Sequence, residues 1–137
     1  MKKLLSIGMF ISVAALALTL YSEKSRVDCS GGEFDLQLKK VYPKIVTPSF
    51  GAQDNNYVIF EFSDPQYENA RLRIFSVEGR NVSEIDSSQR IARSGTLDWY
   101  LKWDCRDSGG STVNPGIYVY QFEGRNKIFT GTIVVAR

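Results

Sequence analysis

The residues of this chain that could do chemistry lie close together in a short polar stretch. Asp104 and Asp107 could act as a general acid and base, and Ser108 could be a nucleophile if a base lay beside it. The 137-residue chain has no histidine, which is the commonest general base and metal ligand. Aspartate side chains readily accept hydrogen bonds from backbone amides in turns. We therefore expect the two aspartates, with Arg106, to fix a turn, and we expect no catalytic site, metal site or cofactor.

Alternating strands must position this turn. Residues 97–103 alternate apolar and polar side chains, which is typical of a half-buried antiparallel strand. Its core-side residues are predicted to be Leu97, Trp99, Leu101 and Trp103, opposite Asp98, Tyr100 and Lys102. An exposed aromatic platform for a sugar or peptide is the alternative for the two tryptophans. Tyr100 is the better candidate for an exposed contact. Core positions are also expected for Tyr118, Tyr120 and Phe122.

Similar patterns recur along the chain between short turns. Strands are predicted over 36–42, 57–62, 70–75, 82–85, 97–103, 117–122 and 127–136. The structural turn is predicted to use Trp103, Asp104, Arg106, Asp107, Gly109, Pro115 and Gly116. About seven antiparallel strands without helices predict an all-β sandwich of the immunoglobulin or fibronectin-III type.

The N-terminus has the form of an export signal. Two lysines precede an apolar run over residues 4–20, and polar sequence follows. We predict a helical signal peptide over 1–22, a linker over 23–35 and the sandwich domain over 36–137. A retained membrane anchor is the alternative, although an apolar run of this length reaches only about 25 Å of a ~30 Å hydrocarbon core.

The chain has two cysteines, Cys29 and Cys105, and export would place both in an oxidising compartment. We therefore predict a Cys29–Cys105 disulfide that ties the N-terminal segment to the turn after Trp103. In the chain-entropy model, closing a loop of that length stabilises the fold by roughly 4 to 5 kcal/mol. Two unpaired thiols are the alternative.

Charge argues against a nucleic-acid partner. Cleavage after Ser22 would remove two of the 17 basic residues and none of the 15 acidic residues, which leaves 15 of each. Nucleic-acid binding needs clustered lysines and arginines. Arg71 and Arg73 share one strand face, which is an ordinary solvated arrangement.

Four short patterns follow one another along the last ~95 residues: Ile74–Val82, Trp103–Gly110, Gly116–Tyr120 and Gly131–Val135. In this order they resemble the immunoglobulin-like domain of the flagellar hook-capping (FlgD-like) family. They are also similar to related C-terminal immunoglobulin or fibronectin-III-like modules of secreted bacterial proteins. The resemblance implies a non-catalytic sandwich.

The chain departs from the family pattern at two places. Cys105 stands where the family has a turn glycine, which a disulfide to Cys29 would explain. The loop over 47–56 lacks most of the family's carboxylates, so a cation site is not expected there.

These features predict an exported, non-catalytic structural or protein-interaction module of the bacterial cell envelope. A sorting or anchoring module of a secretion system, or a small domain that binds a ligand such as a carbohydrate, is the alternative. The location would be periplasmic, cell-surface or extracellular, with protein partners and with membrane contact only through an uncleaved N-terminal segment. A partner strand could pair with an exposed edge at residues 127–136 or 36–42.

Overall fold

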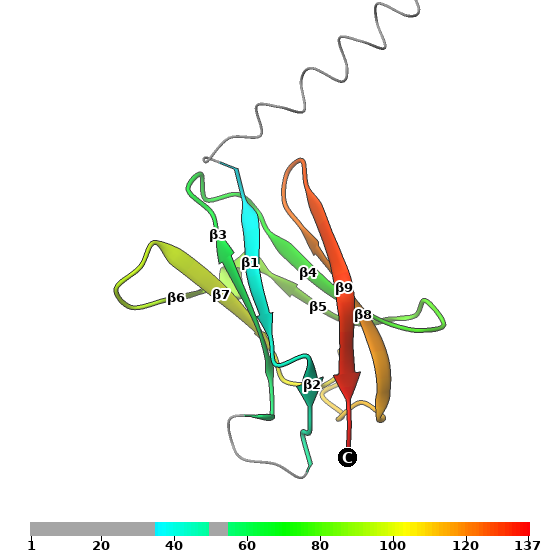
Figure 1. Ribbon diagram of the computed structural model, residues 1–137. Coiled ribbons are helices and arrows are strands. Elements are labelled where there is room, and N and C mark those ends of the chain that lie inside the picture. The colour runs from blue at the N-terminus through cyan, green and yellow to red at the C-terminus, as the bar shows by residue number, and fades with distance from the viewer. Residues whose placement is uncertain (1–34, 50–54) are drawn as a thin grey trace, which may run out of the picture. The chain divides into compact units, whose positions relative to one another are not determined.

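The computed structural model describes residues 35–49 and 55–137 (Figure 1). The predicted signal peptide, nearly all of the predicted linker and Cys29 lie outside this part. No helix within these two described ranges is long and apolar enough to cross a membrane.

Nine strands and the short 3-10 helix η3 lie within the described residues. They are β1 (Gln37–Tyr42), β2 (Ile45–Val46), β3 (Val58–Ser63), β4 (Arg71–Ser76), β5 (Asn81–Asp86), η3 (Ser87–Gln89), β6 (Ile91–Ala92), β7 (Asp98–Trp103), β8 (Gly116–Glu123) and β9 (Ile128–Val135). The seven predicted strands are all present. The sequence prediction missed β2 and β6, because two residues are too few to show an alternating pattern.

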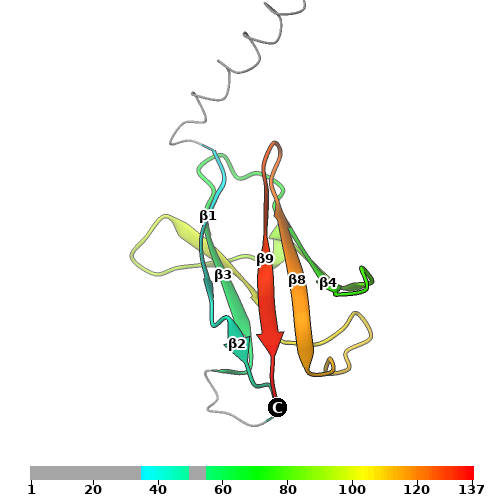
Figure 2. The same ribbon diagram turned by 45° about the vertical axis from the view of Figure 1, so that its right-hand side comes forward.

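The strands form two packed sheets, which confirms the all-β sandwich (Figures 1 and 2). One sheet has the order β1-β3-β7-β6 and the other the order β2-β9-β8-β4-β5. The seven predicted strands pair antiparallel with one another, as expected, and the unpredicted strand β2 adds one parallel pair with β9. The chain leaves the first sheet at Pro43, whose nitrogen has no hydrogen to donate to a ladder, and joins the second sheet two residues later.

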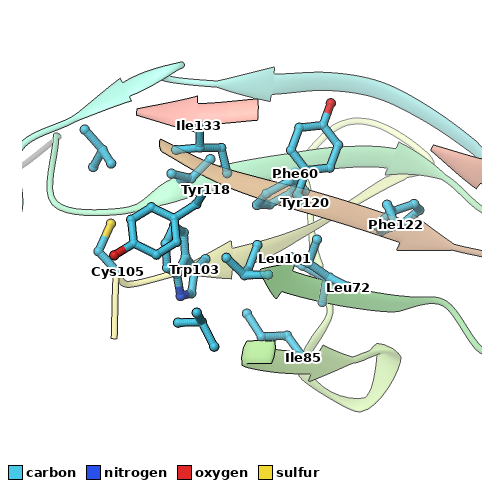
Figure 3. Packing of buried hydrophobic residues seen from close by; sticks show 14 of the residues in the cluster. Phe60, Leu72, Ile85, Leu101, Trp103, Cys105, Tyr118, Tyr120, Phe122 and Ile133 are labelled. Atoms are coloured by element: carbon cyan, nitrogen blue, oxygen red, sulfur yellow. The ribbon is translucent and has the colours of Figure 1, made fainter. Parts of the chain in front are cut away.

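Aromatic side chains from both sheets meet in the core (Figure 3). The rings of Phe60 and Tyr120 lie 5.1 Å apart between centroids, and those of Trp103 and Tyr118 lie 5.6 Å apart. The predicted core positions of Tyr118, Tyr120 and Phe122 are confirmed, because each is buried.

The predicted core role of Leu97 is wrong. Its side chain is 94% exposed, because β7 begins one residue later and Leu97 belongs to the turn that joins β6 to β7. Trp99 is only partly buried at the end of the core, where Tyr67 packs edge-to-face against it at 5.5 Å. The guanidinium of Arg90 also lies 5.4 Å from the Trp99 ring centroid. Tyr67 and Arg90 therefore cover the ring that a sugar-binding platform would present.

Candidate functional site

Side chains of the turn after β7 hydrogen-bond to the turn's own backbone. The indole nitrogen of Trp103 donates to the carbonyl oxygen of Arg106 at 3.0 Å. The Asp104 carboxylate accepts from the Arg106 amide at 3.2 Å. The ion pair between the Arg106 and Asp104 side chains spans 3.9 Å and is well exposed, so it adds little to stability.

Asp107 has the same kind of role further along the turn. Its Oδ1 accepts hydrogen bonds from the amides of Gly109 at 3.0 Å and Ser111 at 2.9 Å. Both aspartates are therefore engaged with backbone amides, as the sequence predicts for a structural turn. The Ser108 amide donates to the Val82 carbonyl oxygen at 2.9 Å, so the turn also contacts β5.

The second part of the turn leads into β8. Gly116 follows Pro115, begins β8 and pairs with Val135 of β9. The Tyr118 hydroxyl donates to the Asn114 carbonyl oxygen at 2.6 Å, and burial raises the pKa of Tyr118. This hydrogen bond holds the loop against the first residues of β8.

A cavity of about 320 Å³ lies between this turn and the turn that joins β4 to β5. Its polar lining includes Arg80, Asn81, Asp107, Thr112 and Asn114. These groups could hydrogen-bond a small polar ligand. Over the described residues, no group of three or more Cys, Asp or Glu side chains is arranged to hold a metal ion.

Cys105 is fully buried beside Tyr118 and Trp103 (Figure 3). Burial, helped by the nearby Asp104 carboxylate, raises the pKa of its thiol to about 12. Its φ of 58° lies in the left-handed region that favours glycine. The Cys29–Cys105 disulfide stays a prediction, because Cys29 lies outside the described residues.

The outer face of the β1-β3-β7-β6 sheet carries tyrosines and cations. The ammonium group of Lys102 lies 4.4 Å from the Tyr57 ring centroid and 5.8 Å from that of Tyr100. Arg93 forms an ion pair with Glu61 on the same face. Tyr100 is partly exposed and lies on the face opposite Trp99 and Trp103, as predicted.

The outer face of the second sheet carries an exposed aliphatic row. Ile45 of β2 pairs with Val134 of β9, and Val134 pairs with Ile117 of β8. Their exposed fractions are 59%, 37% and 53%. We call these three residues the aliphatic row. Val77, 64% exposed, lies in the turn at the end of the adjacent strand β4.

The aliphatic row was not among the features predicted from the sequence. A signal was present in the run Ile133-Val134-Val135, since a half-buried strand needs apolar residues only at alternate positions. Three consecutive apolar residues place at least one of them on the outer face. Ile45 and Ile117 could not be added to Val134 without the strand register.

Two similar solved structures belong to larger chains, of which this chain covers 11% and 31%. No protein-family model matches the chain, and no curated protein matches it. One similar solved structure is PorZ, an essential bacterial surface component of the type-IX secretion system of Porphyromonas gingivalis. It has a TM-score of 0.46 and 20% identity, over 72% of this chain and 11% of PorZ.

A second similar structure is the alkylpurine DNA glycosylase AlkC of Pseudomonas fluorescens, bound to DNA containing an abasic site analog. Its TM-score is 0.42 with 9% identity, over 75% of this chain and 31% of AlkC. With TM-scores below 0.5, neither similarity carries an argument about function. Membership of the hook-capping family stays a prediction.

Proposed function

We propose that this protein is an exported, non-catalytic sandwich domain that binds another protein in the bacterial cell envelope. The aliphatic row carries the proposal. Contiguous apolar side chains on a sheet face are costly to leave in water, and exposed patches of this kind mark interaction sites. Export is inferred from the basic and apolar pattern of the N-terminal residues.

The surroundings of the aliphatic row support a protein partner. The other end of the same sheet face is charged, where Arg73 bridges to Glu123 at 3.0 Å and to Glu84 at 3.5 Å. An apolar centre beside a polar margin is the usual composition of a protein–protein interface. Val134 lies between two paired strands, with Ile45 of β2 on one side and Ile117 of β8 on the other, so ladder hydrogen bonds link the three residues and the surface is preformed.

The chemistry of the turn supports a non-catalytic domain. Asp104 and Asp107 accept backbone hydrogen bonds, and the Cys105 thiol is buried with a raised pKa. A thiol with a pKa of about 12 is almost wholly protonated at neutral pH and is a poor nucleophile. The narrower alternative, a sorting or anchoring module of a secretion system, is favoured by no observation on the described residues.

Crosslinking in intact envelopes tests the proposal. Cells that express the chain would be treated with a short crosslinker, and adducts would be identified by mass spectrometry. We expect a specific protein adduct that Ile117→Glu reduces at least about tenfold, because a buried unpaired carboxylate costs more than 1.4 kcal/mol.

The matched control is Gln121→Glu, which adds the same charge to the same face of β8 outside the aliphatic row. It should leave the adduct unchanged. Both variants must retain the parent melting temperature. Recovery of no specific protein, or an adduct insensitive to Ile117→Glu, would contradict the proposal.

A further inference from the structure

One edge of the second sheet is only partly paired. β9 pairs along its whole length with β8, but on its other side β2 covers only Val134 and Val135. Within the described ranges, no strand pairs with that side of residues 128–133. Figures 1 and 2 show β2 beside only the C-terminal end of β9.

The direction of the backbone groups follows from the contact with β2. The Val134 amide donates to the Lys44 carbonyl oxygen at 2.9 Å, and the Ala136 amide donates to that of Val46 at 2.8 Å. Backbone groups of alternate residues in a strand point to the same side. The N–H and C=O groups of Thr130 and Thr132 therefore point toward the uncovered edge, and β8 does not use them.

The other candidate edge, β1, is less suited to accept a strand. Its register with β3 shifts between Leu38 and Lys40, and the two adjacent lysines there place charges on the edge. Bulges and lysines are the devices that protect edge strands from pairing. β9 has a regular register over its eight residues and carries no charged side chain.

The charges around β9 indicate the kind of strand that fits. Three basic residues lie around β9. Lys127 immediately precedes the strand, and Arg137 comes two residues after its end. Lys44 lies beside the strand, because its carbonyl oxygen accepts a hydrogen bond from the Val134 amide. Lys127 is itself paired with Asp35 at 3.5 Å. A second copy paired antiparallel around Gly131 would bring Arg137 of one chain opposite Arg125 of the other, with Lys127 two residues further along, which is repulsive.

We propose that the uncovered edge of β9 binds an extended strand of a partner protein, uncharged and β-branched at its centre and flanked by carboxylates. This inference rests on the proposed function and adds how the partner is held. The partner's backbone would bond with Thr130 and Thr132, while its outward side chains would continue the outer face that carries the aliphatic row. Strand addition of this kind takes its affinity from main-chain hydrogen bonds and its specificity from the flanking side chains.

A synthetic peptide tests the inference directly. Its centre alternates valine and threonine, and two glutamates flank each end; a second peptide carries lysines in place of the glutamates. We expect the glutamate peptide to bind the purified chain and to slow hydrogen exchange at the Thr130 and Thr132 amides. The lysine peptide should bind at least about tenfold more weakly at low salt, because like charges oppose it.

The critical variant is Thr130→Pro, compared with Thr130→Ala. Proline removes the Thr130 amide hydrogen, which points away from β8, so the pairing of β8 with β9 and the fold are expected to be kept. Alanine removes the threonine side chain but keeps the amide hydrogen. We expect Thr130→Pro to weaken peptide binding at least about tenfold and Thr130→Ala to leave it within about twofold. Thr132→Pro should repeat the loss if Thr130→Pro does not reach the parent melting temperature.

Several results would overturn the inference. They are absence of peptide binding, equal binding of the lysine peptide, and binding unaffected by both proline variants. A dimer that Thr130→Pro dissociates would show that a second copy occupies the edge. Protection of both threonine amides in the free monomer would show that the chain's own residues occupy it. If the envelope adduct survives Thr130→Pro but not Ile117→Glu, the proposed function stands and the strand-addition inference fails.

Discussion

At the scale of single residues, Gly131 shows how a missing side chain permits packing. Gly131 pairs with Tyr120, and a Cβ added at Gly131 would lie only 2.6 Å from Cε1 of the Tyr120 ring. The tyrosine ring therefore occupies the space above the glycine. It also packs at 5.1 Å against Phe60, and burial raises the pKa of Tyr120. The pattern Gly131–Val135 noted in the sequence begins at a residue whose small size is required by the core.

We predict that Gly131→Ala destabilises the fold by about 1 to 3 kcal/mol, the usual cost of an overpacked core. Denaturant unfolding would measure the change. The control is the same substitution in a Tyr120→Leu background, where the smaller side chain leaves room for the new methyl group. An equal cost in both backgrounds would mean that Tyr120 is not the cause.

At the scale of elements, a buried ion pair joins the β3–β4 loop to the segment before β6. Oδ2 of Asp64 accepts a hydrogen bond from Arg90 at 2.8 Å, and Oδ1 accepts from the Glu68 amide at 2.9 Å. The Asp64 side chain is fully buried, and that of Arg90 is 13% exposed. Arg90 also donates to the backbone carbonyls of Ser87 and Glu68.

We predict that Asp64→Ala lowers the free energy of unfolding by about 3 to 5 kcal/mol, because it leaves the Arg90 guanidinium without its buried partner. The matched control is Glu84→Ala, whose ion pairs with Arg71 and Arg73 are partly exposed and should together contribute less than about 1 kcal/mol. Urea denaturation would measure both. Similar losses for the two variants would show that burial does not set the strength of the Asp64 pair.

At the scale of the whole molecule, a buried thiol and two buried tyrosine hydroxyls make the stability of the fold decrease at alkaline pH. The pKa of Cys105 is raised to about 12 by burial, and burial also raises the pKa values of Tyr118 and Tyr120. Each group ionises at lower pH in the unfolded chain than in the folded one. Their contribution to stability is therefore full below the unfolded pKa values and is lost as pH rises toward the folded ones.

We predict that the free energy of unfolding falls as pH rises from about 9 toward 12. Each group that is ionised in the unfolded chain but still protonated in the folded chain lowers the free energy of unfolding by about 1.4 kcal/mol per pH unit. Cys105→Ala should give a shallower decline over this range than the parent chain under reducing conditions. Denaturant titrations at several pH values would measure it, and an identical decline in both proteins would contradict the buried-thiol explanation.

Alternating side chains and the turn residues between them predicted the sandwich class and the seven longer strands, because alternation reports which face of a strand is buried; for residues 82–85 the pattern was short and weak. It also placed Tyr118, Tyr120 and Phe122 in the core. Only the tertiary structure decided where β2 and β6 lie, that β2 runs parallel to β9, and that Leu97 is exposed. The pairing registers between strands that are distant in the sequence bring the aliphatic row together and leave one edge of β9 uncovered. Pairing depends on contacts far apart in the chain, which local patterns do not encode.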